Sequence, residues 1–356
     1  MGRPVWVVVA GTRPEATKLA SVVRGLEYQG QPTLVLGSGQ HTDLLTTSAD
    51  SPWMQTFLDQ WTPLGTVAHP GPGQFAAQVA DTLAAYLGKV TFPVAGVIVQ
   101  GDTATAYGAA QGAQKAGVPV AHVEAGIRSG DPQDPWPEET FRVAIDRIAA
   151  WHLAPTALCE ARLKGEGVLD TITVTGNTGI DTLWWDVDPP GLVQTPLPLV
   201  LITMHRRERW ARLAQIVGAL DDRAAVAVPG LRWYWPVHPN PIIQKAAVGL
   251  KHIEIGPPMG TREFRRALAR ARLVVTDSGG VQEEAAALGV PCCVVRPVSD
   301  RPESVTSGHT LVVGADPEEA AEAVMRELRH PTLSREGFQG FGDGQAGERI
   351  AQTLAQ

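Results

Sequence analysis

The sequence predicts an α/β protein with two parallel-sheet domains that face each other across a cleft. Short apolar runs, the pattern of strands buried on both faces, alternate with helical patterns along most of the chain. A proline-broken stretch, Asp186–Pro198, separates two series of such strands. The 356 residues are enough for two domains, each with its own core.

Composition excludes several classes of protein. The 37 acidic and 30 basic residues give a net charge of −7 without a long basic run, which argues against nucleic acid or an anionic membrane as partner. No apolar run approaches a membrane span, and Met1–Ala10 lacks the apolar region of a signal peptide, so we expect a cytoplasmic protein. The three cysteines (Cys159, Cys292, Cys293) form neither a disulfide framework nor a zinc set, and no metal site is expected.

Five apolar runs predict the strands of the first domain: Val5–Ala10, Thr33–Leu36, Ala95–Val99, Pro119–Val123 and Ile172–Thr175. Helical patterns lie between them, at Ala16–Leu26, Ala76–Leu87, Thr105–Ala116, Thr140–Trp151 and Ile180–Trp185. The segment Thr46–Gly73 is irregular and rich in Trp, Pro and Gly, and we expect it to form loops or a lid.

Two successive strands of this domain each end in a carboxylate, Asp102 and Glu124. The carboxyl ends of parallel strands share one edge of the sheet, and neighbouring strands lie about 5 Å apart. Two acids at that spacing push their pKa values apart, as a proton donor and a proton acceptor require. A capping Asp and a solvated Glu are the alternative. Glu138 is a third candidate, although a Glu in the first turn of a helix is favourable without any chemistry.

Cations also follow the first strand. Arg13 and Lys18 lie at or near its carboxyl end, where open α/β sheets bind ligands, and together they indicate an anion-facing role. In the second domain the predicted strands are Leu199–Thr203, Trp233–Pro236, Val274–Thr276 and Cys292–Arg296. Their carboxyl ends carry two histidines, two arginines and a serine: His205, Arg206, His238, Ser278 and Arg301.

The stretch Leu273–Leu288 predicts an anion site. An apolar β-branched run stops at Asp277–Gly280, and an Ala/Glu-rich helical pattern follows. Gly279 and Gly280 allow a tight turn, so that free N–H groups of the new helix, its dipole and the Ser278 hydroxyl can hold a phosphate. Glu283 or Glu284 could then accept hydrogen bonds from ribose hydroxyls. An ordinary strand–helix turn is the alternative interpretation.

The chain resembles the non-hydrolysing UDP-N-acetylglucosamine 2-epimerases, whose two Rossmann-like domains have the GT-B fold. The matching motifs occur in order over nearly the whole chain: Gly11–Ala16 with Lys18, Gln40–His41, Gly101–Thr103, His122–Gly126, Trp136–Glu139, Thr175–Thr178, His205–Glu208, Val237–Pro241, Asp277–Glu284, Arg301–Glu303 and Gly342–Gly344. We expect the chain to divide into an N-terminal domain (1–185), a linker (186–198), a UDP-binding domain (199–338) and a C-terminal helix (339–356) that packs back on the first domain.

This resemblance implies interconversion of UDP-GlcNAc and UDP-ManNAc without NAD or another cofactor. UDP is eliminated across C1–C2 to give 2-acetamidoglucal and then adds back with inversion at C2. Asp102, Glu124 and Glu138 would be the acid–base groups, and His205 would assist the departing phosphate. The implied ligands of the UDP-sugar are Arg13, Lys18, His238, Phe264, Ser278, Gly279, Gly280, Glu284 and Arg301. Which acid removes the C2 proton stays open.

The resemblance also implies a homodimer and a role in cell-surface polysaccharide synthesis. The segment after Gln40–His41, through Gln74, departs from the family pattern, so allosteric activation by a second UDP-GlcNAc is not assumed. Ser299-Asp300 replaces the usual Thr-Glu before Arg301, and Pro258–Thr261 lacks the Gln or Tyr often seen near the uracil.

Three functions are alternatives to this epimerase activity: a 2-epimerase of a modified sugar such as a UDP-diacetamido-uronic acid, a retaining GT-B glycosyltransferase, and a non-catalytic nucleotide-sugar sensor.

Overall fold

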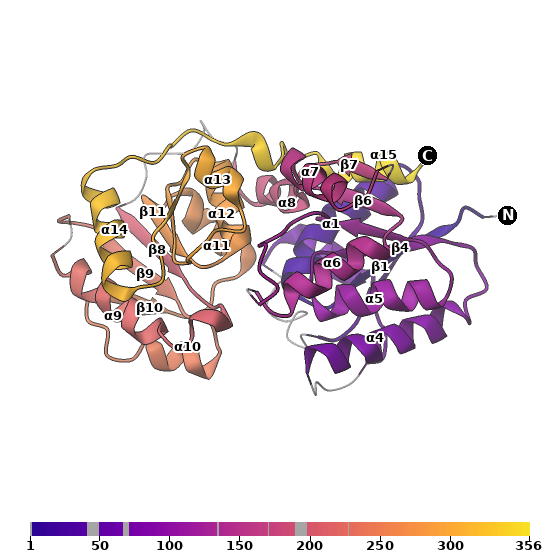
Figure 1. Ribbon diagram of the computed structural model, residues 1–356, viewed down its shortest axis with the longest axis horizontal. Coiled ribbons are helices and arrows are strands. Elements are labelled where there is room, and N and C mark those ends of the chain that lie inside the picture. Colours follow the sequence, from indigo (N-terminus) through magenta and orange to yellow (C-terminus); the bar gives the residue numbers. More distant parts are fainter. Residues whose placement is uncertain are drawn as a thin grey trace. The chain divides into compact units, whose positions relative to one another are not determined.

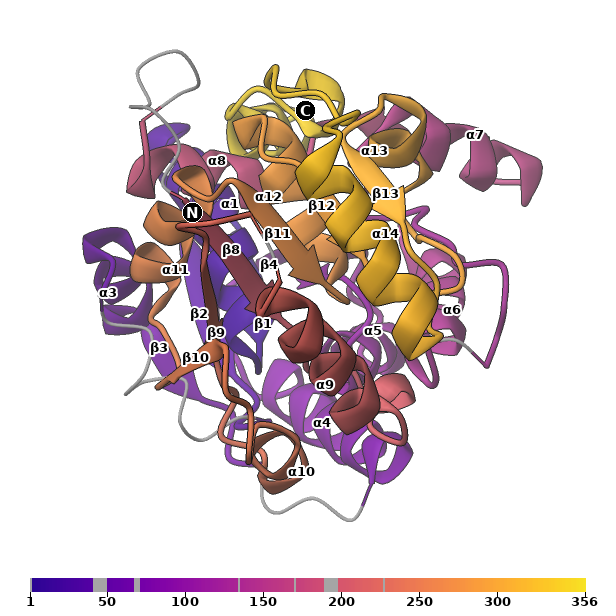
Figure 2. The ribbon, with the colours of Figure 1, turned by 90° about the vertical axis from the view of Figure 1, so that its left-hand side faces the viewer.

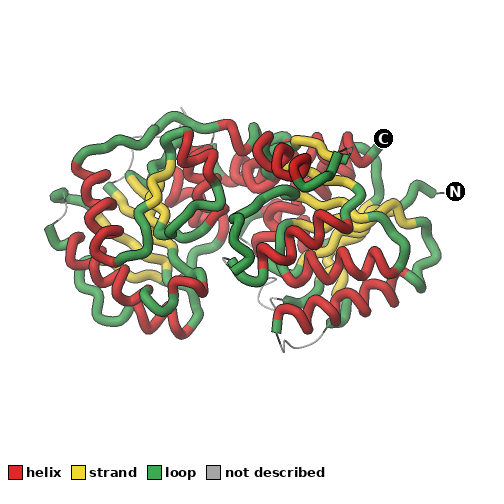
Figure 3. The backbone as a smooth tube through the Cα atoms, viewed as in Figure 1, coloured by secondary structure: helices red, strands yellow, loops and turns green. Residues whose placement is uncertain are grey.

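The computed structural model describes residues 2–40, 50–66, 71–133, 135–169, 171–188, 198–226 and 228–356. The chain divides into two compact units. Unit 1 comprises the described residues up to Trp185 together with Phe341–Gln356, and unit 2 comprises Asp186–Gly340. Each unit is a parallel β-sheet with helices on both faces (Figures 1 and 3). The predicted class, two parallel-sheet α/β domains, is confirmed.

The sheet of unit 1 has seven parallel strands in the order β3-β2-β1-β4-β5-β6-β7. The strands are β1 Val5–Ala10, β2 Thr33–Gly37, β3 Trp61–Pro63, β4 Val94–Gln100, β5 Val120–Val123, β6 Trp151–Ala154 and β7 Ile172–Val174. The helices are α1 Arg13–Tyr28, α3 Pro52–Asp59, α4 Pro72–Leu87, α5 Ala104–Lys115, α6 Glu138–Ile148, α7 Ala157–Gly165, α8 Thr178–Asp186 and α15 Ala346–Leu354.

The central strand β1 shows how the sequence builds both faces of this sheet. Side chains alternate along a strand, and in β1 every one from Trp6 to Ala10 is apolar and buried. Trp6, Val8 and Ala10 pack with α1, α3 and α15, while Val7 and Val9 pack with α4, α5 and α6. A strand covered by helices on both sides needs apolar residues at all positions, which explains the continuous apolar run.

Two predictions in unit 1 are wrong. The segment expected to be loops or a lid contains α3 and β3; α3 buries Met54 and Phe57 in the core, and β3 extends the sheet as its edge strand. The helix expected to run to Trp151 ends at Ile148, because Ala149 is extended and Trp151 begins β6, which pairs with β5. His41, part of the resemblance, lies outside the described residues.

The sheet of unit 2 has six parallel strands in the order β10-β9-β8-β11-β12-β13. The strands are β8 Leu199–Thr203, β9 Arg232–Pro236, β10 Ile253–Gly256, β11 Leu273–Thr276, β12 Cys292–Val294 and β13 Thr310–Val312. The helices are α9 Leu213–Ala224, α10 Pro241–Ala246, α11 Thr261–Ala269, α12 Gly279–Leu288, α13 Pro302–Thr306 and α14 Pro317–Arg329, with short 3₁₀ turns η1 Arg207–Arg209 and η2 Gln339–Phe341.

The core of unit 2 lies between its sheet and the helices α9, α10 and α14. Figure 2 shows α9 and α14 side by side in front of the sheet, and α11 and α12 lie on its other face (Figure 1). The four predicted strands are confirmed, although the last ends at Val294 rather than Arg296. The edge strands β10 and β13 were not predicted, because each is only three or four residues long and partly exposed. In the described ranges, no helix is both long and apolar enough to cross a membrane.

The C-terminal helix α15 packs on α1 within unit 1 (Figure 1). Two glycines make this close approach possible: a Cβ on Gly25 would lie 2.4 Å from the Gly347 carbonyl oxygen. The carboxylate of Asp181, on α8, accepts hydrogen bonds from the Ala346 and Gly347 amides at 3.0 and 2.7 Å. These are amides of the first turn of α15, which have no partner inside the helix. Asp181 therefore caps α15 from another element.

Replacing Asp181 should weaken the docking of α15. In Asp181→Ala, two buried amides lose their acceptor, which we expect to lower the free energy of unfolding by about 1–3 kcal/mol. Hydrogen–deuterium exchange of residues 341–356 should become faster. Asp81→Ala is the matched control, because Asp81 is an exposed carboxylate paired with Lys115 at the surface. Unchanged exchange in Asp181→Ala would show that the cap does not hold the helix.

Candidate functional site

The two predicted carboxylates follow neighbouring strands. β4 and β5 pair in parallel, with Gln100 opposite Val123, so that Asp102 and Glu124 leave the same edge of the sheet. The predicted adjacency of these strands is confirmed. Between β4 and Asp102 the chain turns at Gly101, whose φ of +68° is a conformation that favours glycine. Thr103 then caps α5 by accepting a hydrogen bond from the Ala106 amide at 3.0 Å.

Glu124 is held in a strained conformation. Its φ is 73°, unusual for a residue with a side chain. Lys18 Nζ contacts both carboxylate oxygens of Glu124, at 2.7 and 2.6 Å, and Gln100 Nε2 donates to the same carboxylate. The Lys18 and Glu124 side chains are 16% and 8% exposed, so this ion pair is largely shielded from water. Strained residues that several partners fix are concentrated at functional sites.

Asp102 has a different cationic partner. It forms an ion pair with Arg142 of α6, and the Asp102 side chain is 28% exposed while that of Arg142 is 6% exposed. Glu138 begins the same helix four residues before Arg142, so the two residues lie on one face of α6. Glu139 instead accepts hydrogen bonds from the Ser129 and Gly130 amides at 3.0 and 3.2 Å, and so secures that loop.

A buried network, which the sequence analysis did not single out, supports the turn before Asp102. His122 contacts the Asp146 carboxylate at 2.6 Å through Nδ1 and the Gly101 carbonyl at 2.8 Å through Nε2. Arg128 donates to the same carboxylate at 2.7 Å. Burial opposes ionisation of Asp146, but His122 and Arg128 lower its pKa below the usual value. The carbonyl can only accept, so Nε2 of His122 donates and fixes the peptide that precedes Asp102.

A second buried carboxylate ties together the ends of β1 and β4. Glu15 Oε2 accepts hydrogen bonds from the Gly11 and Thr12 amides at 3.0 and 2.7 Å, and Oε1 accepts one from the Thr103 hydroxyl at 2.6 Å. Burial raises the pKa of Glu15 to about 7, although these hydrogen bonds oppose the shift. Arg13, the first residue of α1, lies between these anchored residues.

In unit 2, α12 begins directly after β11 as the glycine motif predicts. Ser278 is its N-cap, and the Ser278 hydroxyl makes no capping bond to the helix. A Cβ on Gly279 would lie 3.2 Å from the guanidinium carbon of Arg301, so Arg301 packs directly against the first turn of α12. Space beside Gly280 is open. The free amides of a ten-residue helix and an adjacent guanidinium are an arrangement of the kind that can hold an anion.

Buried carboxylates hold the arginines of this arrangement in place. Arg301 forms an ion pair with Glu283 of α12, and Asp300 lies 3.6 Å from Arg301. Asp300 also faces Arg296 at 2.9 Å and Arg206 at 3.7 Å. Burial opposes ionisation of Asp300, but Arg301, Arg206 and Arg296 hold its pKa far below the usual range. Three guanidinium groups thus surround one carboxylate, and their orientation is fixed before any ligand binds.

His205 extends from a loop that Asp277 pins. The Asp277 carboxylate accepts hydrogen bonds from the His205 amide at 3.0 and 3.2 Å and from the Arg206 amide at 2.9 Å. The His205 side chain is 44% exposed, and its ring lies 6.4 Å from that of His238 in a stacked orientation. The structure therefore brings together two of the predicted residues that follow β8 and β9. In the sequence, the position of Asp277 at the start of the motif Asp277–Gly280 is the feature that could have indicated this role in holding the loop.

The structure separates the two glutamates proposed for a ribose. Glu283 is buried in its ion pair with Arg301. The Glu284 side chain is 17% exposed and contacts Arg265 of α11 at 2.7 Å. Phe264, predicted to lie near a uridine, directly precedes Arg265 on α11. Arg265 itself was not predicted, because an arginine in a charged amphipathic helix normally indicates a solvated face.

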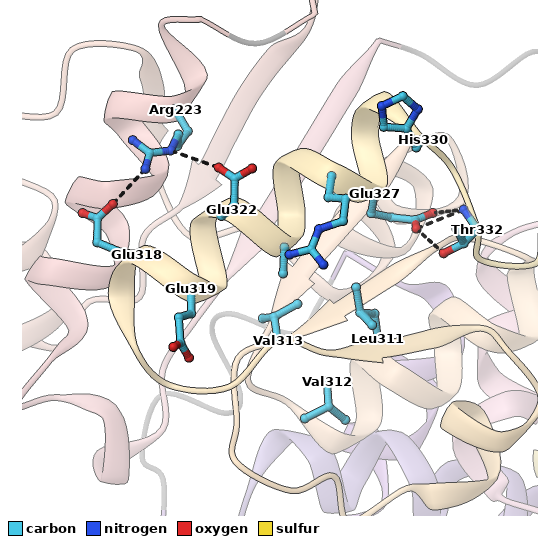
Figure 4. Close-up of a pocket in the computed structure, with 12 residues that line it drawn as sticks. Arg223, Leu311, Val312, Val313, Glu318, Glu319, Glu322, Glu327, His330 and Thr332 are labelled. Carbon is cyan, nitrogen blue, oxygen red and sulfur yellow. Dashed lines mark hydrogen bonds and ion pairs between the residues drawn. The ribbon is translucent and has the colours of Figure 1, made fainter.

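A pocket elsewhere in unit 2 contains none of the predicted residues. It lies between α14 and β13 and has a volume of about 780 Å³ (Figure 4). Several of its charged side chains already contact one another or the backbone: Arg223 contacts Glu318 at 2.9 Å, and Glu327 accepts from the Thr332 amide at 3.0 Å. Groups paired in this way do not converge on a ligand. Among the residues that the structure describes, no three His, Cys, Asp or Glu side chains are arranged to hold a metal ion.

Comparison with known proteins identifies the family. The family model described as UDP-N-acetylglucosamine 2-epimerase matches residues 35–355. This chain belongs to that family. A UDP-N-acetylglucosamine 2-epimerase of Escherichia coli O157:H7 is 33% identical over 375 residues, which cover 98% of this chain and 97% of the relative. The family that the motifs resemble is thus confirmed.

Solved structures of the family have the same fold. The UDP-GlcNAc 2-epimerase of Neisseria meningitidis, bound to UDP-GlcNAc, matches with a TM-score of 0.88 and 27% identity over 99% of both chains. The enzyme of Methanocaldococcus jannaschii, in complex with UDP-GlcNAc and UDP, matches with a TM-score of 0.83 and 29% identity over 99% of both chains. The fold of this chain is therefore shared by family members that bind a nucleotide sugar.

The raised pKa of Glu15 predicts a pH-dependent stability. The folded state binds more protons than the unfolded state between pH values of about 4.5 and about 7, so this group lowers the free energy of unfolding as the pH rises through that window. The full effect is on the order of 3 kcal/mol. Glu15→Gln should remove this part of the pH dependence, measured by urea denaturation at several pH values.

The control is Glu27→Gln, at an exposed position of the same helix, α1. This variant should keep the pH dependence of the protein without substitutions. Equal pH dependence in Glu15→Gln and the unchanged protein would contradict the assignment of this titration to Glu15.

Proposed function

We propose that this chain interconverts UDP-GlcNAc and UDP-ManNAc by epimerisation at C2, without NAD. The observation that carries this proposal is that the carboxylates Asp102 and Glu124 follow neighbouring strands, each paired with its own cation, in a chain of this family. Relatives whose structures contain UDP-GlcNAc support this substrate. A pair of positioned carboxylates suits a reaction that removes a proton and returns it.

The proposed reaction has two halves. A carboxylate removes the C2 proton, the C1–O bond breaks, and UDP leaves with the bonding electrons to give 2-acetamidoglucal. UDP then adds back at C1, while an acid delivers a proton to the opposite face of C2. The C2 proton is not acidic, so stabilisation of the leaving diphosphate has to supply much of the lowering of the barrier.

Unit 2 supplies the groups proposed for the diphosphate. Ser278, the amides of Gly279 and Gly280, and Arg301 form the anion-binding arrangement described above. His205, with an exposed ring on a pinned loop, is proposed to donate a proton or a hydrogen bond to the departing phosphate. These donors are already oriented, and such preorganisation is what makes electrostatic stabilisation effective.

Unit 1 supplies the groups proposed for proton transfer. Asp102, Glu124 and Glu138 are the candidates, and α6 brings Glu138 to the helix face that carries the Asp102 partner, Arg142. Lys18, assigned to the nucleotide by resemblance, is paired with Glu124, so we propose that it controls the charge of this carboxylate. Arg13, His238 and Phe264 are proposed to contact the nucleotide.

Isotope exchange tests the proposed activity. Incubation of the purified chain with UDP-GlcNAc in heavy water should give UDP-ManNAc and place deuterium at C2 of the sugar, because the proton is exchanged while the glycal is bound. Mass spectrometry and NMR measure both. Recovery of unlabelled UDP-GlcNAc would refute the proposal; label in a modified UDP-sugar alone, or transfer of the sugar to an acceptor, would indicate the corresponding alternative activity.

Removing one carboxylate should stop the exchange. Asp102→Asn and Glu124→Gln should each lower the rate of deuterium incorporation by about 10²–10⁴-fold, the usual contribution of a positioned acid or base. Asp81→Asn, at an exposed carboxylate, is the control and should keep the full rate. Full activity in both site variants would exclude these two residues as the acid–base pair and leave Glu138 as the candidate.

The homodimer and the role in cell-surface polysaccharide synthesis stay predictions of the resemblance, and the cytoplasmic location stays a prediction from the sequence pattern.

A further inference from the structure

Arg265, on α11, is buried between the carboxylates of Asp186 and Glu284. Its side chain is 1% exposed. Nη1 contacts Asp186 at 2.8 Å, while Nε and Nη2 contact Glu284 at 3.0 and 2.7 Å. Asp186 is also buried, with a side chain that is 0% exposed. Three charged groups therefore meet in the interior of unit 2, and of these only Glu284 was predicted to belong to a site.

The contacts fix the conformation of Glu284. A guanidinium has a planar fork of donors, and here two of its nitrogens contact the same carboxylate oxygen, Oε1. The third guanidinium nitrogen, Nη1, contacts Asp186, so the Arg265 guanidinium cannot rotate without breaking another buried contact. A buried ion pair of this kind contributes little net stability, because desolvation of the charges opposes it. Its effect is to select one orientation of the side chain.

The second carboxylate oxygen of Glu284 remains available. Among the described residues, the hydrogen bonds that Glu284 accepts on its side chain both end on Oε1, and this side chain is 17% exposed. Glu283, its neighbour, differs in both respects, because it is buried and engaged with Arg301. Arg265 thus occupies one acceptor oxygen and leaves the other for a hydroxyl group of a ligand.

The position of Glu284 on α12 suits a ribose. Glu284 follows Gly279 by five residues, and at about 1.5 Å per residue it lies roughly 7–8 Å along the helix from the free amides of the first turn. In a nucleoside diphosphate, the ribose hydroxyls lie a few bonds beyond the phosphates. A diphosphate at the first turn therefore leaves the ribose within reach of a carboxylate one to two turns further along.

We propose that Arg265 and Asp186 are positioning residues, which hold Glu284 so that its free oxygen accepts a hydrogen bond from a ribose hydroxyl of the nucleotide. The inference rests on the proposed function for the nucleotide itself. It adds two residues that the sequence assigned to no role in the site. Arg265 comes from an amphipathic helix, and Asp186 is the first residue of the predicted linker.

Asp186 is well placed for this task. It is the last residue of α8, and its backbone carbonyl accepts a hydrogen bond from Arg266 at 3.4 Å. The side chain and the backbone of Asp186 therefore contact successive arginines of α11. Residues 189–197 of the predicted linker lie outside the described residues.

Deletion of single hydroxyl groups from the ligand tests this inference. Isothermal titration calorimetry compares the binding of UDP, 2′-deoxy-UDP and 3′-deoxy-UDP to the whole protein. The unchanged protein should bind UDP about 10-fold or more tightly than at least one deoxy analogue, since a hydrogen bond to a charged group is lost. Glu284→Gln should reduce this ratio. Arg265→Met and Asp186→Asn should reduce it as well, although both keep Glu284.

Two further variants separate positioning from a structural role. Arg265→Lys keeps the charge but not the fork, so it should restore folding where Arg265→Met fails to fold, with a ratio below that of the unchanged protein. Arg270→Met removes an exposed arginine at the end of the same helix and should keep the full ratio.

Variants at Arg265 and Asp186 that weaken all three ligands equally, with the ratio intact, would overturn the inference. An unchanged protein that does not distinguish UDP from either deoxy analogue would overturn it too. Because these are binding ratios, their outcome is independent of the deuterium exchange that tests the proposed epimerase activity.

Discussion

The parallel pairing of strands is the constraint on which the rest of this structure depends. In unit 1 it places the residues after β4 and β5 at one edge, and in unit 2 it does the same for the residues after β8 and β11. Asp102 and Glu124 are 22 positions apart in the chain, yet they follow adjacent strands. The same geometry brings His205 beside Asp277. Asp102, Glu124 and His205 thus each follow a largely buried strand, which cannot shift without exposing its core.

Charge pairing determines what these edges can do. Lys18 holds Glu124, Arg142 holds Asp102, and Arg265 holds Glu284. Buried charges are costly unless they are paired, so every such partner restricts the side chain to one orientation. The arginines around Asp300 show the same principle with the signs reversed, because there a carboxylate orients the cations. Side chains that paired charges hold in one orientation suit a reaction in which charge develops and is removed again.

Much of the fold followed from the pattern of apolar residues, as the match at β1, β8 and β11 shows. The failures have physical causes. α3 and β3 are short elements in a segment rich in Trp, Pro and Gly, and β6 follows α6 so closely that the apolar pattern runs on without a break. In the site, residues inside motifs such as Ser278 and Glu124 could be proposed from sequence. Arg142, which pairs with Asp102, and Arg265, which pairs with Glu284, could not, because each lies on a separate helix, where an arginine normally indicates a solvated face.

The sequence by itself determined the class of fold, the family and the residue types at the strand ends. These depend on local periodicity and on short motifs, which are visible in the order of residues alone. Only the tertiary structure decided which charges meet. Glu283 pairs with Arg301, Glu284 pairs with Arg265 through one oxygen, and Lys18 pairs with Glu124. The left-handed backbone of Glu124 could likewise be seen only in the structure. Such pairings depend on side-chain distances and desolvation, and these are set by packing between elements rather than by the order of residues.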